Sequence, residues 1–309
     1  MHAEPALDKH ARLKAAVRKR WDRIDWASPI SPATLVIPER HYMDVGALDL
    51  SHAQRVELNR LMACFTCELF IHFEGYVIRY LERRAHRIAG LSRALVDRFV
   101  AEERVHSEMF QKLLHKLRPD LYPLTLADHA AAPAEMPRRF IRWSKGDDVA
   151  LSIAPIGTFF MLAWLFEEIT LFVPQVLEET PRESSALVAA VMTLHAEEEE
   201  PHVAIDERVV AMLRDKTARW SSWCQALLTL PLLAYVESKV KRSWHKLTAQ
   251  ASVELALSPA QTARIRARGP TQSDRLGMQS FAAKMAESDL AGAGLVSWAL
   301  ERELRRSAT

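Results

Sequence analysis

Apolar residues recur at three- and four-residue steps over most of the chain, the spacing that aligns side chains on one face of an α-helix. In the first segment Leu58, Leu61 and Phe65 share a face with two polar residues, Glu68 and His72. Four long segments follow this pattern: 51–84, 91–117, 155–178 and 180–216. We therefore predict four long helices, which together would form a four-helix bundle.

Local signals support the ends of these helices. The fourth helix opens with Thr180-Pro181-Arg182-Glu183, where Thr would be the N-cap, Pro the first helical residue and Glu the partner in a capping box. A similar box, Ser258-Pro259-Ala260-Gln261, predicts another helix start. Residues 119–147 are rich in Pro, Ala and Asp and are predicted to be a long crossover with short helical pieces.

The remaining segments extend the bundle and are not expected to form separate domains. Residues 1–50 combine a charged amphipathic stretch with Pro29, Pro32 and Pro38, which predicts an N-terminal helix followed by an extended arm. Residues 217–309 are predicted to add packing helices. We expect one helical domain over residues 1–309, with the bundle core at 51–216.

Composition agrees with an all-α fold. The 309 residues are 49% hydrophobic and 26% charged, and 9 glycines are too few for the many turns of a β-rich protein. The formal net charge is only +2, and the basic residues alternate with acidic ones. No nucleic-acid partner is expected from this distribution.

Cysteine use and the N-terminal sequence favour the cytoplasm. Cys64, Cys67 and Cys224 are odd in number and too few for a disulfide framework, and Cys64 and Cys67 are expected to be buried thiols. No apolar leader follows Met1. The apolar run 226–235 contains a proline and is too short to span a bilayer, so we expect a buried helix and no membrane partner.

Two Glu-x-x-His pairs carry the chemistry. Glu103 and His106 lie on the second predicted helix, and Glu199 and His202 lie on the fourth, each pair on one helical face. One such pair would occur by chance in a chain with 12 histidines. The helix before each pair adds weight, because it carries a glutamate within an apolar sequence.

These upstream carboxylates are Glu68, 103 − 68 = 35 residues before Glu103, and Glu168, 199 − 168 = 31 residues before Glu199. Buried carboxylates are costly unless they are paired or bind a metal. Glu followed by Glu-x-x-His, repeated over four helices, is the ligand set of carboxylate-bridged di-iron or di-manganese bundles. Glu167 competes with Glu168, since adjacent residues differ by about 100° around a helix.

A further imidazole narrows the family. His195 precedes Glu199 by four residues, and the resulting His-x-x-x-Glu-x-x-His resembles the para-aminobenzoate N-oxygenase (AurF-type) family of the ferritin-like superfamily. The resemblance implies a helical homodimer with two iron ions, dioxygen as co-substrate, an external electron donor and an aromatic amine as substrate. It implies seven ligands: Glu68, Glu103, His106, Glu168, His195, Glu199 and His202. Manganese is the alternative metal, because such ligand sets accept both.

Residues outside the ligand set have other expected roles. His72 and Asp206 fall four residues beyond Glu68 and His202 and are candidates for orienting the ligands. Four glutamates are expected to form a solvated face: Glu102, Glu197, Glu198 and Glu200. Besides N-oxygenation, hydroxylation or desaturation of C–H bonds in a small molecule fits the same ligands, and a ferritin-like iron oxidase is the alternative of a different class.

Overall fold

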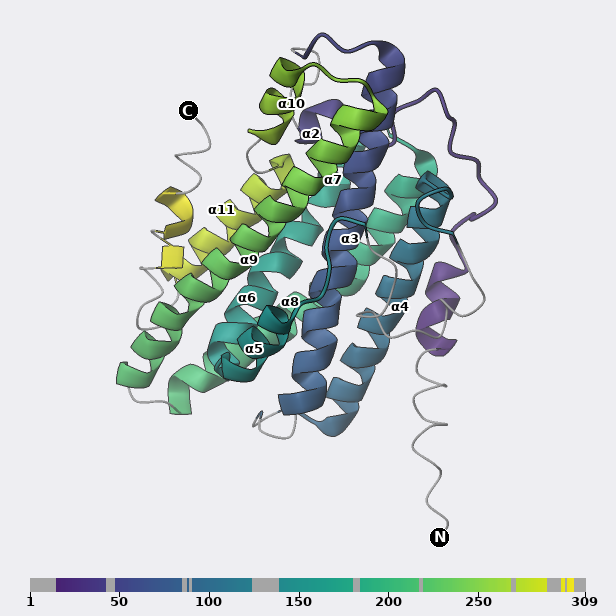
Figure 1. Ribbon diagram of the computed structural model, residues 1–309. Helices are drawn as coiled ribbons and strands as arrows, with labels where there is room; N and C mark the ends of the chain where they lie inside the picture. The colour runs from purple at the N-terminus through teal and green to yellow at the C-terminus, as the bar shows by residue number, and fades with distance from the viewer. Residues whose placement is uncertain are drawn as a thin grey trace.

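The computed structural model describes residues 15–42, 48–84, 88, 91–123, 139–179, 184–216, 219–267, 271–287, 296–297 and 299–302. These residues form helices and turns, without a strand among them. Figure 1 shows the long helices running side by side. Their bounds are α2 Glu39–Tyr42, α3 His52–Arg84, α4 Arg93–Leu117, α5 Lys145–Ile153, α6 Ile156–Leu171, α7 Val173–Glu178, α8 Ala186–Lys216, α9 Arg219–Glu254, α10 Pro259–Arg266 and α11 Gln272–Glu287.

The all-α prediction is confirmed, and the long helices begin and end near the predicted residues. Ser92 caps α4, because its hydroxyl accepts a hydrogen bond from the Leu95 amide at 3.2 Å. The third predicted helix is divided into α6 and α7 at Phe172. The predicted box at Ser258 and Gln261 is present at the start of α10, whereas the box at 180–183 lies outside the described residues.

Two helix pairs build the bundle. Helix α3 packs along α4, α6 packs along α8, and α4 also contacts α8. Helix α9 lies against α3 and α6, α10 packs on α9, and α11 covers α6 (Figure 1). Of the predicted crossover, residues 124–138 lie outside the described part, and its last residues begin α5 with a capping box of Ser144 and Asp147.

Burial of the apolar helices is uneven. By length and composition α3 and the segment Ile156–Glu178 could each cross a membrane, but 78% and 72% of their most apolar windows are buried inside the molecule. Cys64 and Cys67 are buried and free on α3, as expected. The apolar run 226–235 lies within α9 but is not fully buried, because Leu227 and Leu228 are half exposed.

The core consists of two apolar clusters separated by a polar layer. Along α3 the first cluster ends at Ile71 and the second begins at Tyr76, so Glu74 lies between them. The same change occurs between Val100 and Val105 on α4 and within residues 195–202 of α8. The four-helix packing therefore brings buried charged residues of different helices to one depth.

Candidate metal centre

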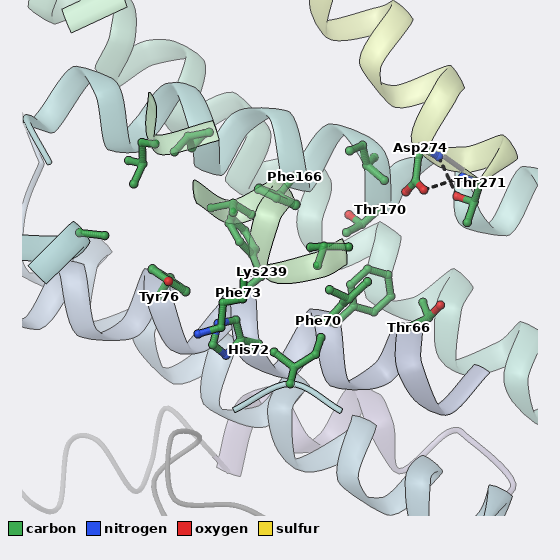
Figure 2. A pocket seen from close by; sticks show the side chains of 18 of the residues that line it. Thr66, Phe70, His72, Phe73, Tyr76, Phe166, Thr170, Lys239, Thr271 and Asp274 are labelled. Atoms are coloured by element: carbon green, nitrogen blue, oxygen red, sulfur yellow. Dashed lines mark hydrogen bonds between the residues drawn. The ribbon is translucent and has the colours of Figure 1, made fainter. Parts of the chain in front are cut away.

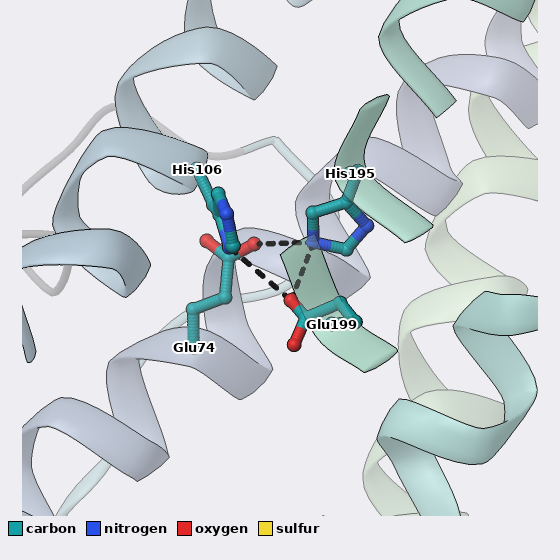
Figure 3. Close-up of side chains that lie close together, drawn as sticks. All are labelled: Glu74, His106, His195 and Glu199. Atoms are coloured by element: carbon teal, nitrogen blue, oxygen red, sulfur yellow. Dashed lines mark ion pairs between the residues drawn. The ribbon is translucent and has the colours of Figure 1, made fainter. Parts of the chain in front are cut away.

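The polar layer contains two groups of side chains that share one glutamate. The first group is Glu74 of α3, His106 of α4, and His195 and Glu199 of α8 (Figure 3). His195 Nε2 lies 2.7 Å from Glu199 Oε1 and 3.5 Å from Glu74 Oε1. His106 Nδ1 lies 3.2 Å from Glu199 Oε1. Two imidazoles and two carboxylates therefore converge on one point.

The second group has three carboxylates and one imidazole, and so more oxygen donors than the first. It comprises Glu103 of α4, Glu167 of α6, and Glu199 and His202 of α8. His202 Nδ1 lies 2.8 Å from Glu199 Oε2 and 3.0 Å from Glu103 Oε1. Each oxygen of Glu199 thus faces a different group, the position that a bridging carboxylate occupies between two metal ions.

These side chains fit a pair of cations better than they satisfy one another. All seven are buried, with at most 3% of each residue exposed. Several inward-facing atoms meet no partner in hydrogen-bond geometry within the described part of the chain: Glu74 Oε1, Glu103 Oε1, Glu167 Oε1 and Oε2, His106 Nδ1 and His195 Nε2. Buried carboxylates and imidazoles without such partners are costly, and two divalent cations would neutralise and coordinate them.

Two carboxylates outside the groups contact the Nε2 atoms of His106 and His202. His106 Nε2 lies 2.9 Å from Glu198 Oε2, so the imidazole of α4 is bound by a glutamate of α8. The reverse contact joins His202 Nε2 of α8 to Glu102 Oε2 of α4 at 3.1 Å. If each Nε2 carries the proton, each Nδ1 is left to bind a metal.

The expectation that Glu102 and Glu198 belong to a solvated face is wrong, whereas Glu197 and Glu200 are exposed as expected. Glu102 and Glu198 are 7% and 3% exposed. The signal that was missed is the repeated Glu-Glu-x-x-His sequence, in which the residue before each predicted ligand is also acidic. Where α4 and α8 face each other, both adjacent glutamates of each motif are buried.

The electrostatics of the metal-free site show how strongly its groups interact. Burial alone disfavours a charged imidazole, but Glu103, Glu198 and Glu199 hold the pKa of His106 well above its ordinary value. Burial disfavours the Glu199 carboxylate as well, yet His195 and His202 hold its pKa well below the ordinary value. Cations that bind these imidazoles would compete with protons, so metal binding should depend on pH.

Glu68 does not join these groups. Its carboxylate accepts hydrogen bonds from Tyr122 Oη at 2.8 Å and from the amides of Arg139, Phe140 and Ile141 at 2.6 to 2.8 Å. It therefore fixes the start of the segment leading to α5. Glu74 takes the predicted place because it lies 84 − 74 = 10 residues before the end of α3, and Glu103 lies 103 − 93 = 10 residues after the start of α4. Glu68 is six residues farther along α3, about 9 Å from that depth.

Glu168 also lies outside both groups. It accepts hydrogen bonds from Ser280 Oγ at 2.6 Å and Lys284 Nζ at 2.8 Å, both on α11. Glu167, the alternative that the sequence left open, faces Glu103 and Glu199 instead. Because adjacent helical residues point about 100° apart, only the packing of α11 against α6 decides which carboxylate faces inward.

The two candidate orienting residues have different surroundings. His72 lies outside the groups, with its ring 5.1 Å from Tyr76 and its Nε2 3.8 Å from Asp147 Oδ1. Asp206 is fully buried, and burial together with the Glu103 and Glu199 charges holds its pKa well above the ordinary value, although a hydrogen bond with Glu167 lowers it. Asp206 therefore stays a candidate for positioning Glu167, whereas His72 is placed beside Tyr76 and Asp147.

A cavity of about 110 Å³ lies beside the first group. Its wall is mainly apolar, and Figure 2 shows Phe70, Phe73 and Phe166 pointing into it. The Phe70 ring also lies 5.3 Å from the His195 ring, centre to centre. One aromatic side chain therefore separates the cavity from a candidate ligand.

The comparison with known families agrees with this geometry. Residues 9–289 match the family described as p-aminobenzoate N-oxygenase AurF. The chain belongs to this family. The AurF match covers the bundle, α9 and α10, and it extends through α11, so it includes every residue of both groups. Searches of curated proteins and of solved structures found no match.

Membership of the AurF family establishes the broad activity. The protein is a di-iron oxygenase, and the buried Glu and His groups are where two iron ions would bind. Family membership also implies dioxygen, an aromatic amine and an electron donor as reaction partners. When bound, the iron pair supplies the capacity to reduce dioxygen; the chain supplies the ligands, their orientation and a dry apolar surrounding.

Proposed function

We propose that this protein oxygenates the nitrogen of a small arylamine, giving a hydroxylamine, nitroso or nitro product. The observation that carries the proposal is the convergence of seven buried side chains from four helices on two adjacent points. The proposed ligands are Glu74, Glu103, His106, Glu167, His195, Glu199 and His202. Glu199 would bridge the two ions, since it alone belongs to both groups.

The two proposed positions differ in their donors. The first has two imidazoles and two carboxylates, and the second has one imidazole and three carboxylates. Counting Glu199 once, four carboxylates balance the four charges of two divalent ions. Glu102 and Glu198 would keep the His202 and His106 rings in the orientation that points Nδ1 inward.

The cavity beside His195 is the proposed substrate site. Aromatic side chains from α3 and α6 line it, including Phe73 and Phe166, whose rings lie 4.4 Å apart. A flat aromatic amine fits such a wall, because rings in offset or edge contacts contribute about 0.5–1.5 kcal/mol beyond area burial. Phe70 would then set the distance between the bound amine and the first metal position.

The test uses full-length protein loaded anaerobically with Fe(II), then exposed to ¹⁸O-labelled dioxygen with a panel of neutral and acidic arylamines. Mass spectrometry should find ¹⁸O on nitrogen. Glu199→Gln should abolish the product, and the matched control Glu200→Gln, at an exposed neighbour, should retain it. Labelled oxygen on carbon instead would identify a C–H hydroxylase, and iron uptake without any organic product would favour an iron oxidase.

A further inference from the structure

A buried tryptophan near an exposed N-terminal segment is hydrogen-bonded to the outer carboxylate of one candidate ligand. Trp21 Nε1 donates a hydrogen bond to Glu198 Oε2 at 2.8 Å, and the same oxygen lies 2.9 Å from His106 Nε2. The Trp21 and His106 rings are 5.9 Å apart, centre to centre, with a tilt of 58°. Trp21, Glu198 and His106 thus form a continuous hydrogen-bonded chain.

The series Trp21–Glu198–His106 is buried, and the outer carboxylate at the second position has a different partner. Trp21 is 1% exposed and His106 is fully buried, so water does not interrupt the contacts. At the second position the outer carboxylate, Glu102, accepts from the guanidinium of Arg98 at 2.9 Å. Within the described residues, the hydrogen-bonded link from outer carboxylate to indole is found at His106 and not at His202.

The outer side of the Trp21 segment is basic. Residues 15–21 are helical and contact α4 through the ion pair of Arg18 with Glu108. Four exposed cations lie within residues 18–23: Arg18, Lys19, Arg20 and Arg23. Arg20 NH1 lies 3.4 Å from Glu198 Oε1, so this surface meets the hydrogen-bonded series at Glu198. We call these four cations the basic patch. Asp22 and Asp25 are the acidic residues within 18–25, which leaves that stretch with a net charge of 4 − 2 = +2.

These features suit electron transfer. Tunnelling through protein weakens exponentially with distance, and hydrogen bonds and aromatic rings shorten the gaps that an electron must cross. Indole is among the most easily oxidised side chains. A basic surface also attracts an acidic protein and raises its association rate at low salt.

We propose that Trp21 and Glu198 form the route by which electrons from an acidic one-electron donor protein, docked on the basic patch, reach the metal bound at His106. The proposal rests on the ligand role of His106 given above. In each transfer the donor loses one electron and one ferric ion becomes ferrous, while Trp21 and Glu198 return unchanged. Two transfers reduce the pair. Trp21 acts here through His106 and is a positioning residue for the electron path.

The experiment measures reduction, separately from product formation. Iron-loaded, oxidised full-length protein is mixed anaerobically with reduced plant-type [2Fe–2S] ferredoxin, an acidic protein too large for the cavity, and the ferric absorbance is followed. Trp21→Phe should lower the rate constant by about tenfold or more, since it removes the N–H and the indole. Trp244→Phe is the matched control, because that buried indole donates to the Ile265 carbonyl. Both variants lose one buried hydrogen bond and should melt lower than wild type, and both should keep the iron content of the wild type.

Surface variants test the docking step without touching the core. Lys19→Glu with Arg23→Glu should slow reduction by ferredoxin several-fold at low salt and leave reduction by dithionite unchanged. Lys241→Glu with Arg242→Glu, exposed on α9, should have no effect. The proposal is overturned if ferredoxin fails to reduce the wild-type protein, or if Trp21→Phe is reduced as fast as wild type. Loss of iron binding in wild type would instead count against the proposed function.

Discussion

Replacing Glu68 and Glu74 separately should distinguish a structural carboxylate from a metal ligand on the same helix. Glu68→Gln leaves one acceptor oxygen where the carboxylate accepts four hydrogen bonds from Tyr122 and residues 139–141. Two of these bonds should be lost. Glu74→Gln removes a buried carboxylate with Oε1 directed at the first metal position, and its other oxygen accepts from Ser107.

The two substitutions should have different effects on the metal-free and the metal-loaded protein. A hydrogen bond to a charged group contributes about 1.5–3 kcal/mol, so Glu68→Gln should lower the free energy of unfolding by about 3–6 kcal/mol. Glu74→Gln keeps an oxygen that can accept from Ser107, and Glu74 Oε1 accepts no hydrogen bond from the described residues, so metal-free stability should change little. Loss of a ligand that weakens binding about 100-fold removes about 2.7 kcal/mol of metal-induced stabilisation.

The assay is thermal unfolding of both variants without metal and with Fe(II) under anaerobic conditions, together with metal content per chain. We expect Glu68→Gln to melt on the order of 10 °C lower and still bind two ions. Glu74→Gln should melt like wild type without metal and gain little from Fe(II). The reverse pattern, with Glu68→Gln losing an ion and Glu74→Gln keeping both, would refute the assignment of Glu74.

The same logic gives further tests. Glu167→Gln should reduce metal content toward one ion per chain, while Glu168→Gln should keep two and cost about 1–3 kcal/mol in thermal unfolding. Burial raises the pKa of Asp147, but hydrogen bonds with His72 and Lys239 lower it by more, so the net pKa lies below the ordinary carboxyl value of about 4. The stabilising effect of Asp147 is therefore present above that pH and is lost as the pH falls below it. The stability gap between wild type and Asp147→Asn in urea should therefore narrow from pH 7 to pH 3. Phe70→Ala should extend activity to bulkier arylamines, seen as a lower KM for substituted anilines. Sedimentation should give a homodimer, twice the chain mass of 35.1 kDa.

The sequence by itself determined the helical segments and the members of the site that are fixed by local spacing. Glu103 with His106, and His195 with Glu199 and His202, are three or four residues apart on single helices, where periodicity alone places them on one face. The structure brings all five together. Such short-range relations need no knowledge of turns or of neighbouring helices.

Relations between helices depended on tertiary structure. The spacing of 35 residues selected Glu68, but α3 ends at Arg84 and α4 begins at Arg93, and the residue as far from its helix end as Glu103 is Glu74. Glu167 and Glu168 were left open because one residue changes the helical direction by about 100°, and the contacts of Glu168 with α11 decide between them.

The burial of the outer carboxylates was also decided by packing. The repeated Glu-Glu-x-x-His sequence marks Glu102 and Glu198, but spacing along a single helix does not show that each would meet a histidine of the opposite helix. The contact between α4 and α8 removes both from water and pairs them with His202 and His106. Local periodicity therefore specified which residues share a helix face, and only the assembled bundle specified what each face contacts.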